Sequence, residues 1–134
     1  MEVCARVRAA PAHQQRAPWE HEVGYSRAIR VRDRVLVAGT TAIVDGEPAF
    51  TGDAYRQTRL ILEIIERALR QAGAQMRDVV RTRIFTTDIA LWGEIGRAHG
   101  EVFAEVMPAV TMVQVAALID PRLLVEIEAE AITS

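Results

Sequence analysis

Apolar and polar residues alternate over residues 25–31, and the neighbouring residues 34–39 resume a composition that is typical of a β-strand. The short polar pair Arg32-Asp33 separates them. Alternation with a period of two is typical of a β-strand, and two such runs around a short polar turn are typical of a hairpin. We therefore expect a β-hairpin here, with its second strand ending near Gly39-Thr40.

A helical period follows the turn cluster Asp45-Gly46-Glu47-Pro48. Between residues 54 and 72 apolar residues recur every three or four positions, with arginines and glutamates at most of the others. This spacing predicts an amphipathic helix with Thr51 or Asp53 as N-cap and Gly73 at its C-terminal end. Because an isolated amphipathic helix is marginal in water, its apolar face must pack on another element. That face consists of Leu60, Ile61, Ile64, Ile65, Ala68 and Leu69.

The second half of the chain predicts one more helix and three more strands. A strand is expected over residues 79–87 and a helix over residues 91–106. Residues 110–116 and 124–132 predict the last two strands, on either side of the chain break at Asp120-Pro121. The order strand, strand, helix, strand, helix, strand, strand indicates an α+β fold, a mixed β-sheet with two helices packed on one face. Gly93, Gly96 and Gly100 weaken the second helix by up to about 1 kcal/mol each relative to alanine.

The last strand has two faces of different character. Its odd-numbered residues from Val125 to Ala131 are apolar and are expected under the helices, whereas Glu126, Glu128 and Glu130 point the other way. In the strand over residues 79–87, Arg81 and Arg83 share one face with Phe85. If these strands pair, arginines and glutamates can neutralise one another there. Such a face suits either a subunit contact or a solvated antiparallel sheet.

The length of 134 residues fits an N-terminal tail over residues 1–18 and a single domain over residues 19–134. A net charge of −2 provides no broad basic field, so we expect neither a nucleic-acid partner nor a membrane partner. No apolar run approaches the roughly 20 residues that span a bilayer, and the first residues lack the apolar centre of a secretory signal. We therefore expect a cytoplasmic protein.

The sequence excludes several kinds of chemistry. Cys4 is the only cysteine, which rules out an intrachain disulfide and a cysteine-rich metal site. The three histidines show no convincing paired spacing, so we expect no metal. All sixteen basic residues are arginines, and the absence of lysine rules out a side-chain Schiff base with a substrate or with pyridoxal phosphate. No cofactor is expected.

Four motifs follow one another along the chain: Tyr25-Ser26-Arg27-Ala28 before a strand that ends Val37-Ala38-Gly39, then Phe85-Thr86-Thr87-Asp88, Pro108-Ala109 and Val125-Glu126-Ile127-Glu128-Ala129. In this order they resemble the motifs of the YjgF/Rid (reactive intermediate deaminase, RidA-like) family. The resemblance covers about residues 19–132 and implies a chorismate-mutase-like α+β fold. It also implies a homotrimer whose three sheets face a central barrel-like core, with small-molecule clefts between subunits. The best-known members hydrolyse enamines and imines to a 2-oxo acid and ammonia, which implies a hydrolase or deaminase acting on C–N bonds.

The resemblance implies site residues position by position. Tyr25 matches the family tyrosine at the cleft, and Glu126 matches the acid associated with activating water, so both are candidate catalytic residues. Gly39 matches the glycine whose backbone lies beside the ligand, and Thr40 follows it as a candidate ligand-binding residue. A carboxylate can deprotonate an attacking water and a backbone amide can hold a ligand oxygen, so these roles are chemically reasonable.

The resemblance fails at one position. Deaminating members carry an arginine directly after Pro-Ala that holds the substrate carboxylate, whereas this chain has Val110, followed by Thr111. Losing such an ion pair costs several kcal/mol of transition-state binding, on the order of 10²-fold in rate. We therefore expect the usual 2-imino acid deaminase activity to be weak or absent. The alternative is a non-catalytic small-molecule-binding or regulatory trimer.

Three further residues are candidates for ligand binding. Arg27 and Arg83 could each supply the missing cation from another direction, although an ordinary ion-pair or surface arginine is the more common role. His99 could serve as a general acid or base if its helix borders the cleft, because its ordinary pKa of about 6.5 suits proton transfer. A helix histidine more often packs or faces solvent.

Overall fold

One five-stranded sheet, with the strand order β1-β2-β7-β5-β6, is the centre of the molecule. The structure is a computed structural model that describes residues 19–134, so the tail predicted over residues 1–18 lies outside the described residues. Strands β5 and β6 are parallel and the other neighbours are antiparallel. The elements are α1 (Trp19–Val23), β1 (Ala28–Val31), β2 (Arg34–Thr40), β3 (Ile43–Val44), β4 (Glu47–Pro48), α2 (Ala54–Gln71), η1 (Met76–Asp78), β5 (Val79–Thr86), η2 (Ile89–Leu91), α3 (Trp92–Phe103), β6 (Ala109–Gln114) and β7 (Val125–Ile132).

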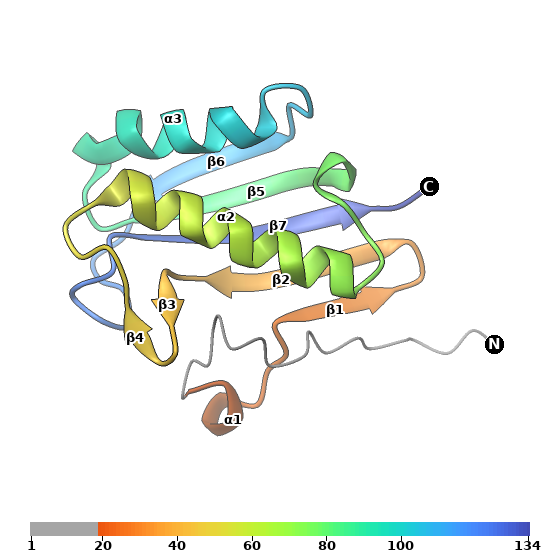
Figure 1. The fold of residues 1–134 in the computed structure, drawn as a ribbon, viewed down its shortest axis with the longest axis horizontal. Coiled ribbons are helices and arrows are strands. Elements are labelled where there is room, and N and C mark those ends of the chain that lie inside the picture. The colour runs from red at the N-terminus through yellow and green to blue at the C-terminus, as the bar shows by residue number, and fades with distance from the viewer. Residues whose placement is uncertain (1–18) are drawn as a thin grey trace.

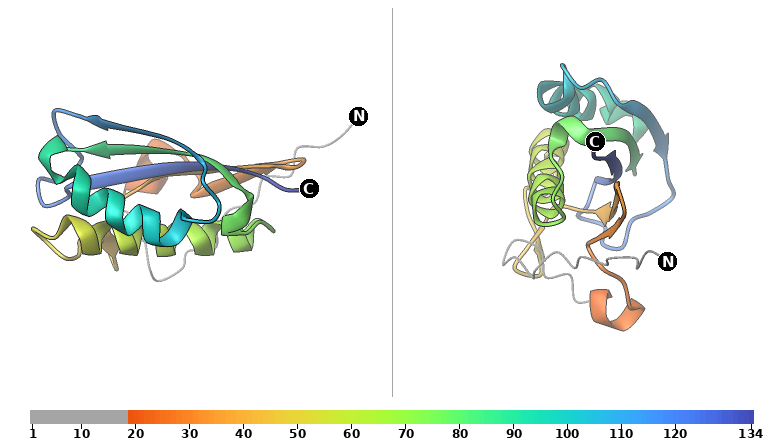
Figure 2. Two further views of the ribbon diagram at one scale, coloured as in Figure 1. Left: turned by 90° about the horizontal axis from the view of Figure 1, so that it is seen from above. Right: turned by 90° about the vertical axis from the view of Figure 1, so that its right-hand side faces the viewer.

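Both long helices lie on the same face of this sheet, as predicted (Figures 1 and 2). Helix α2 begins at its N-cap Asp53, whose carboxylate accepts the Arg56 N–H at 2.9 Å. It ends just before Gly73, which adopts the left-handed φ of +82° that favours glycine. The core between the helices and the sheet includes Ile61, Leu62, Ile65, Leu69, Ile95, Phe103, Val35, Val37, Val125 and Ile127.

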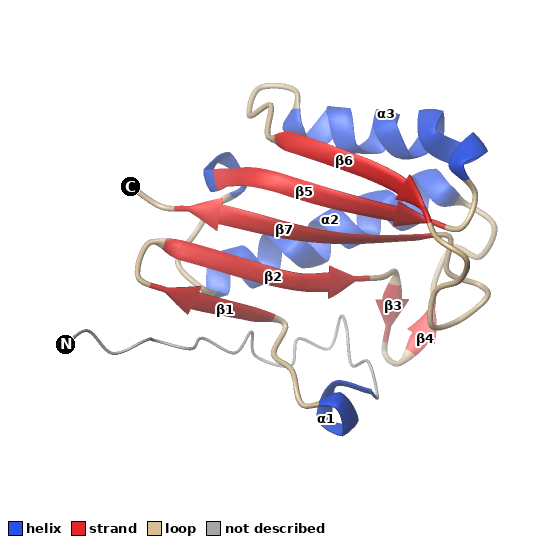
Figure 3. Ribbon diagram, turned by 180° about the vertical axis from the view of Figure 1, so that it is seen from behind, coloured by secondary structure: helices blue, strands red, loops and turns tan. Residues whose placement is uncertain are grey.

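The predicted hairpin is confirmed, with a shorter first strand. Strand β1 begins at Ala28, so Tyr25 and Ser26 precede the sheet rather than belong to it. The sequence pattern missed α1 and the small β3–β4 hairpin, which forms where a plain turn was expected. These two elements lie beside the β1–β2 end of the sheet (Figure 3).

The face away from the helices carries the predicted pairs of arginine and glutamate. The β5–β7 register sets Arg81 opposite Glu130 and Arg83 opposite Glu128. The Arg83 Nη1 lies 3.1 Å from a carboxylate oxygen of Glu128 and 3.6 Å from one of Glu130. Charges therefore neutralise one another on this face, which we call the open face of the sheet (Figure 3).

In the part of the chain that the structure describes, no helix combines the length and the hydropathy required to cross a bilayer.

Candidate functional site

A cavity of about 330 Å³ is lined by residues of α1, of the turn between α1 and β1, of β2 and of β7, with one residue each from the segments that follow β2 and precede β7. Both predicted catalytic residues, Tyr25 and Glu126, line it, and so do Gly39 and Arg27. The structure thus gathers four residues that the sequence analysis selected from three separate segments. The remaining lining residues are Trp19, Ala38, Thr41 and Ile119.

Glu126 is the acid of the β7 row that no arginine faces on β5. The antiparallel register sets Glu130 beside Arg81 and Glu128 beside Arg83, but it sets Glu126 beside Phe85. Within residues 19–134 the Glu126 carboxylate makes no hydrogen bond and no ion pair, whereas Glu128 and Glu130 both do. Its carboxylate is therefore available to a ligand or a water molecule.

Gly39 provides the space that the Glu126 side chain occupies. The β2–β7 register shifts between Val37, which faces Ala129, and Thr40, which faces Ile127, so β2 carries an extra residue there. A Cβ atom at Gly39 would lie 2.5 Å from Oε2 of Glu126. Any side chain at this position would displace the carboxylate, which explains the glycine in physical terms.

Arg27 is buried beside this bulge, with 8% of its surface exposed. Its Nη2 donates to the Gly39 carbonyl at 2.8 Å, and its Nη1 donates to the Thr40 hydroxyl at 3.3 Å. The Thr40 hydroxyl donates in turn to the Ala38 carbonyl at 2.8 Å. Burial lowers the pKa of the Arg27 guanidinium, and the neighbouring Tyr25, Glu20 and Glu126 oppose that shift. Arg27 thus holds the bulge in shape, and Thr40 acts through the same network.

Tyr25 reaches the cavity from the turn between α1 and β1. The Arg27 guanidinium carbon lies 5.4 Å from the centre of its ring, within the range of a cation–π contact. Burial raises the pKa of the Tyr25 hydroxyl, while Arg27 and a hydrogen bond with the Trp19 side chain lower it. The hydroxyl therefore stays protonated at neutral pH and can donate a hydrogen bond.

The pKa of Glu126 is raised from its ordinary value of 4.5. Burial is the main cause, the charge of Arg27 opposes it, and the neighbouring Glu128 adds to it. A carboxylate with a raised pKa is a stronger base than a solvated one, which suits proton abstraction from water. The cavity thus combines a carboxylate of raised pKa with a hydroxyl that can donate a hydrogen bond.

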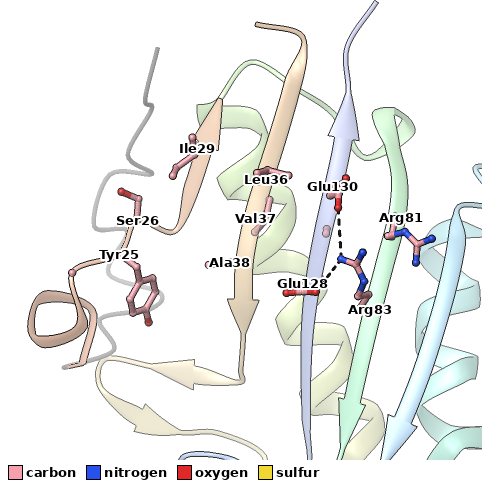
Figure 4. A pocket seen from close by; sticks show the side chains of 12 residues that line it. Tyr25, Ser26, Ile29, Leu36, Val37, Ala38, Arg81, Arg83, Glu128 and Glu130 are labelled. Carbon is pink, nitrogen blue, oxygen red and sulfur yellow. Dashed lines mark hydrogen bonds and ion pairs between the residues drawn. The ribbon is translucent and has the colours of Figure 1, made fainter. Parts of the chain in front are cut away.

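A larger hollow of about 850 Å³ lies beside the first, on the open face, and shares Tyr25 and Ala38 with it (Figure 4). Arg83 lies in this hollow, and its guanidinium pairs with Glu128 and Glu130 (Figure 4). Of the two arginines considered as substitutes for the missing cation, Arg27 lies at the cavity and Arg83 does not line it.

His99 belongs to α3, on the opposite side of the sheet, and is among the buried residues of that helix. Its Nε2 and the Thr82 hydroxyl form a hydrogen bond of 2.9 Å, and its ring packs against Phe103 with centroids 4.6 Å apart. Burial lowers the pKa of this histidine. In one subunit it does not line the cavity around Glu126, and its contacts are those of a packed core residue.

Val110 and Thr111 belong to β6, the edge strand of the sheet. The parallel register places Val110 beside Thr82 and Thr111 beside Arg83. Neither residue lines the cavity of the same subunit, because β5 separates β6 from β7. Only a second copy of the chain could bring them to Glu126.

Trp19, Ala38, Thr41 and Ile119 are the cavity residues that sequence reasoning missed. Trp19 comes from α1, whose five residues are too few to show a helical period. Residues 19–134 contain no cluster of three or more histidine, cysteine, aspartate or glutamate residues that could hold a metal ion. Cys4 lies outside the described residues.

Comparisons with known proteins agree with one another. The family model described as endoribonuclease L-PSP matches residues 15–133. An uncharacterised protein of Streptomyces coelicolor is 38% identical over 118 residues, 88% of this chain and 88% of that protein. The 3-aminoacrylate deaminase RutC of Acinetobacter baylyi is 35% identical over 108 residues, 80% of this chain and 85% of that protein. The crystal structure of a Mycobacterium tuberculosis protein, described as a member of the highly conserved YjgF family, matches with a TM-score of 0.80 and 49% identity, over 90% of this chain and 96% of that chain.

Proposed function

The chain belongs to the endoribonuclease L-PSP family, which is the YjgF/Rid family, and we propose that it binds a small enamine- or imine-like metabolite and hydrolyses its C–N bond. Its fold is the α+β fold of the solved YjgF structures, as the sequence resemblance implied. The observation that carries the proposal is the Glu126 carboxylate, which lines a cavity beside Tyr25 and Gly39. The similarity to a 3-aminoacrylate deaminase supports chemistry at a C–N bond.

The geometry supports a direct hydrolytic sequence. Glu126 takes a proton from water while the water oxygen attacks the imine carbon, and the π electrons of the C=N bond move to nitrogen. The proton held by Glu126 then passes to the nitrogen, which gives a carbinolamine. The carbinolamine hydroxyl loses its proton to Glu126 and the nitrogen gains it, the C–N bond breaks with its electron pair going to nitrogen, and the carbonyl product forms as the amine or ammonia leaves. Tyr25 is placed to donate a hydrogen bond to the reacting nitrogen or oxygen. For an enamine, protonation at carbon to give the iminium precedes these steps.

The same proposal includes a homotrimer with its clefts between subunits. Strand β6 is an edge strand without a charged residue, and most of its residues are exposed. Uncharged exposed edges are unusual in proteins that remain monomeric, because they pair with other chains. Covering β6 and the open face with neighbouring copies removes this liability and brings Val110 and Thr111 towards the Glu126 of another subunit.

Val110 determines which substrates we expect the site to prefer, those without a carboxylate. An apolar side chain cannot form the two-pronged ion pair with a substrate carboxylate that arginine forms. The expected rate with 2-iminobutyrate is therefore on the order of 10²-fold or more below that of an arginine-containing site.

The test is an ammonia-release assay with purified protein on a panel of imines and enamines. We expect turnover of at least one panel member, a loss of 10²-fold or more in kcat for Glu126→Gln, and a gain of 2-iminobutyrate hydrolysis for Val110→Arg. Efficient hydrolysis of 2-iminobutyrate by the natural chain, unchanged by Val110→Arg, contradicts the role given to Val110. If no panel member turns over while a small ligand still raises Tm, the alternative of a non-catalytic binding trimer replaces the hydrolase proposal.

A further inference from the structure

The charges around the cavity are not balanced. Glu126 is the carboxylate that lines it, and Arg27 is the guanidinium. Two other acids act on the same groups, since Glu128 raises the pKa of Glu126 and Glu20 raises the pKa of Arg27. Because Glu128 is itself paired with Arg83, two acids, Glu126 and Glu20, act beside one arginine, and the net field favours a positive charge on the ligand.

Arg27 is also poorly placed to receive an anion. Its two terminal nitrogens already donate to the Gly39 carbonyl and the Thr40 hydroxyl, and 8% of the residue is exposed. A ligand carboxylate would have to reach a guanidinium of which little is exposed and would lie against Glu126. Both have a cost in free energy, because the carboxylate loses its hydration and like charges repel.

The remaining walls suit a flat group. Trp19 and Tyr25 contribute aromatic side chains, and Ala38, Gly39 and Ile119 contribute small or apolar surface. The volume of about 330 Å³ accommodates a small planar molecule. The Glu126 carboxylate, without a protein partner among residues 19–134, can accept two parallel N–H bonds from such a group.

We propose that this cavity selects a planar nitrogen cation that carries no carboxylate, such as a protonated imine derived from an amine rather than from an amino acid. The proposal rests on the proposed function for the identity of the site and adds the class of its substrate. With a primary iminium, the balanced reaction is R₂C=NH₂⁺ + H₂O → R₂C=O + NH₄⁺. Glu126 first holds the N–H groups and then takes the proton of the attacking water.

The binding test uses benzamidine and benzoate, which have the same shape and opposite charge. Isothermal titration calorimetry at neutral pH on the full chain should give a Kd for benzamidine at least tenfold below that for benzoate. Glu126→Gln should remove this preference. Glu63→Gln, which neutralises an exposed acid on α2 and so makes the same change in net charge, should leave it intact. Equal affinities for the two probes, or a preference that survives Glu126→Gln, overturns the proposal.

A turnover test separates this inference from the proposed function. 2-Iminobutyrate and propan-1-imine differ by the carboxylate and can be generated in situ by an amino-acid oxidase and an amine oxidase. Faster hydrolysis of propan-1-imine supports both proposals. Faster hydrolysis of 2-iminobutyrate keeps the hydrolase and overturns the charge selection. Selective benzamidine binding with hydrolysis of neither imine keeps the charge selection and counts against hydrolysis of these imines.

Discussion

Phe85, which faces Glu126 across β5 and β7, leaves that carboxylate without an arginine partner on β5. The β5 strand presents Arg81, Arg83 and Phe85 in turn to the glutamates of β7, and the third glutamate meets an aromatic ring in place of a guanidinium. Glu128 and Glu130 therefore form ion pairs with arginines, whereas the Glu126 carboxylate forms none among residues 19–134 and stays available to a ligand. The residue on β5 thus decides whether the facing glutamate of β7 is neutralised by an arginine or remains unpaired.

Replacing Phe85 with arginine should inactivate the site without unfolding the chain. The new guanidinium would lie beside Glu126 and pair with it, as Arg83 pairs with Glu128. We expect benzamidine affinity and imine turnover to fall tenfold or more, while the circular dichroism spectrum is unchanged. Phe85→Leu serves as the control and should retain both. An unchanged benzamidine affinity in Phe85→Arg contradicts the inference that Glu126 is available to a ligand because no arginine faces it on β5.

The raised pKa of Glu126 predicts a shift in the pH profile. Because the base must be ionised, kcat/KM should fall as the pH drops through the raised pKa, with a midpoint above the ordinary value of 4.5. The groups acting on this carboxylate are Arg27 and Glu128. A midpoint at or below 4.5 contradicts the burial argument.

The same pKa shift has a consequence for stability. A carboxyl group with a raised folded pKa favours the folded state most when it is protonated, so this contribution is present below pH 4.5 and is lost as the pH rises through the raised value. Glu126→Gln removes the cost of burying the charge. Its Tm should exceed that of the natural chain at pH 7, and the difference should shrink towards acidic pH. Thermal melts across this range provide the measurement.

At the scale of elements, α3 contains three glycines, and at none of them does a neighbouring atom leave too little space for a side chain. A Cβ atom added at Gly93, Gly96 or Gly100 meets nothing within 4 Å. Gly73 after α2 is different, because its φ is +82° and a Cβ there would lie 2.9 Å from Nη1 of Arg30. The structure therefore requires glycine at position 73 but not at positions 93, 96 and 100 of α3.

Alanine at Gly96 should stabilise the protein, since it lowers the entropy of the unfolded chain and fits the helix without a clash. The expected gain is about 0.5–1 kcal/mol, or a few degrees in Tm. Gly73→Ala is the matched control and should lower Tm, because its backbone conformation is strained for a residue with a Cβ. Differential scanning calorimetry measures both. A lower Tm for Gly96→Ala contradicts the open space beside this residue.

At the scale of the whole molecule, one face of the sheet is covered by helices and the other is open, with an uncharged strand at its edge (Figure 3). On β6, Val113 is 42% exposed and Val110 is 46% exposed. A copy of the chain that covers this edge would bury both residues. The proposed clefts between subunits depend on such an assembly.

A lysine at Val113 should prevent this assembly, because burying an unpaired charge in an interface is costly. We expect the molar mass from size-exclusion chromatography with light scattering to fall from that of a trimer towards that of a monomer. Phe50→Lys, at a residue exposed to a similar extent before α2, should leave the mass unchanged. A monomeric natural chain contradicts the proposal of clefts between subunits.

The sequence alone predicted most of the fold. The three-and-four spacing between residues 54 and 72 located α2, and the alternation from Val125 to Ala131 located the buried face of β7. It also selected Tyr25, Gly39 and Glu126 by resemblance, and these residues do meet at one cavity. Short elements such as α1 and the β3–β4 hairpin were missed, since four or five residues are too few to show a period.

What the sequence by itself determined is what depends on neighbours along the chain: the period of each long element, the turns between them, and the kind of residue on each face. Only the tertiary structure decided which strands pair and in which register. That pairing placed Phe85 rather than an arginine beside Glu126, set Gly39 against the same carboxylate, and engaged Arg27 with the β2 bulge. It also placed His99 and Val110 away from the cavity. The physical reason is that periodicity is a local property of the backbone, whereas register and close approach result from packing between residues far apart in sequence.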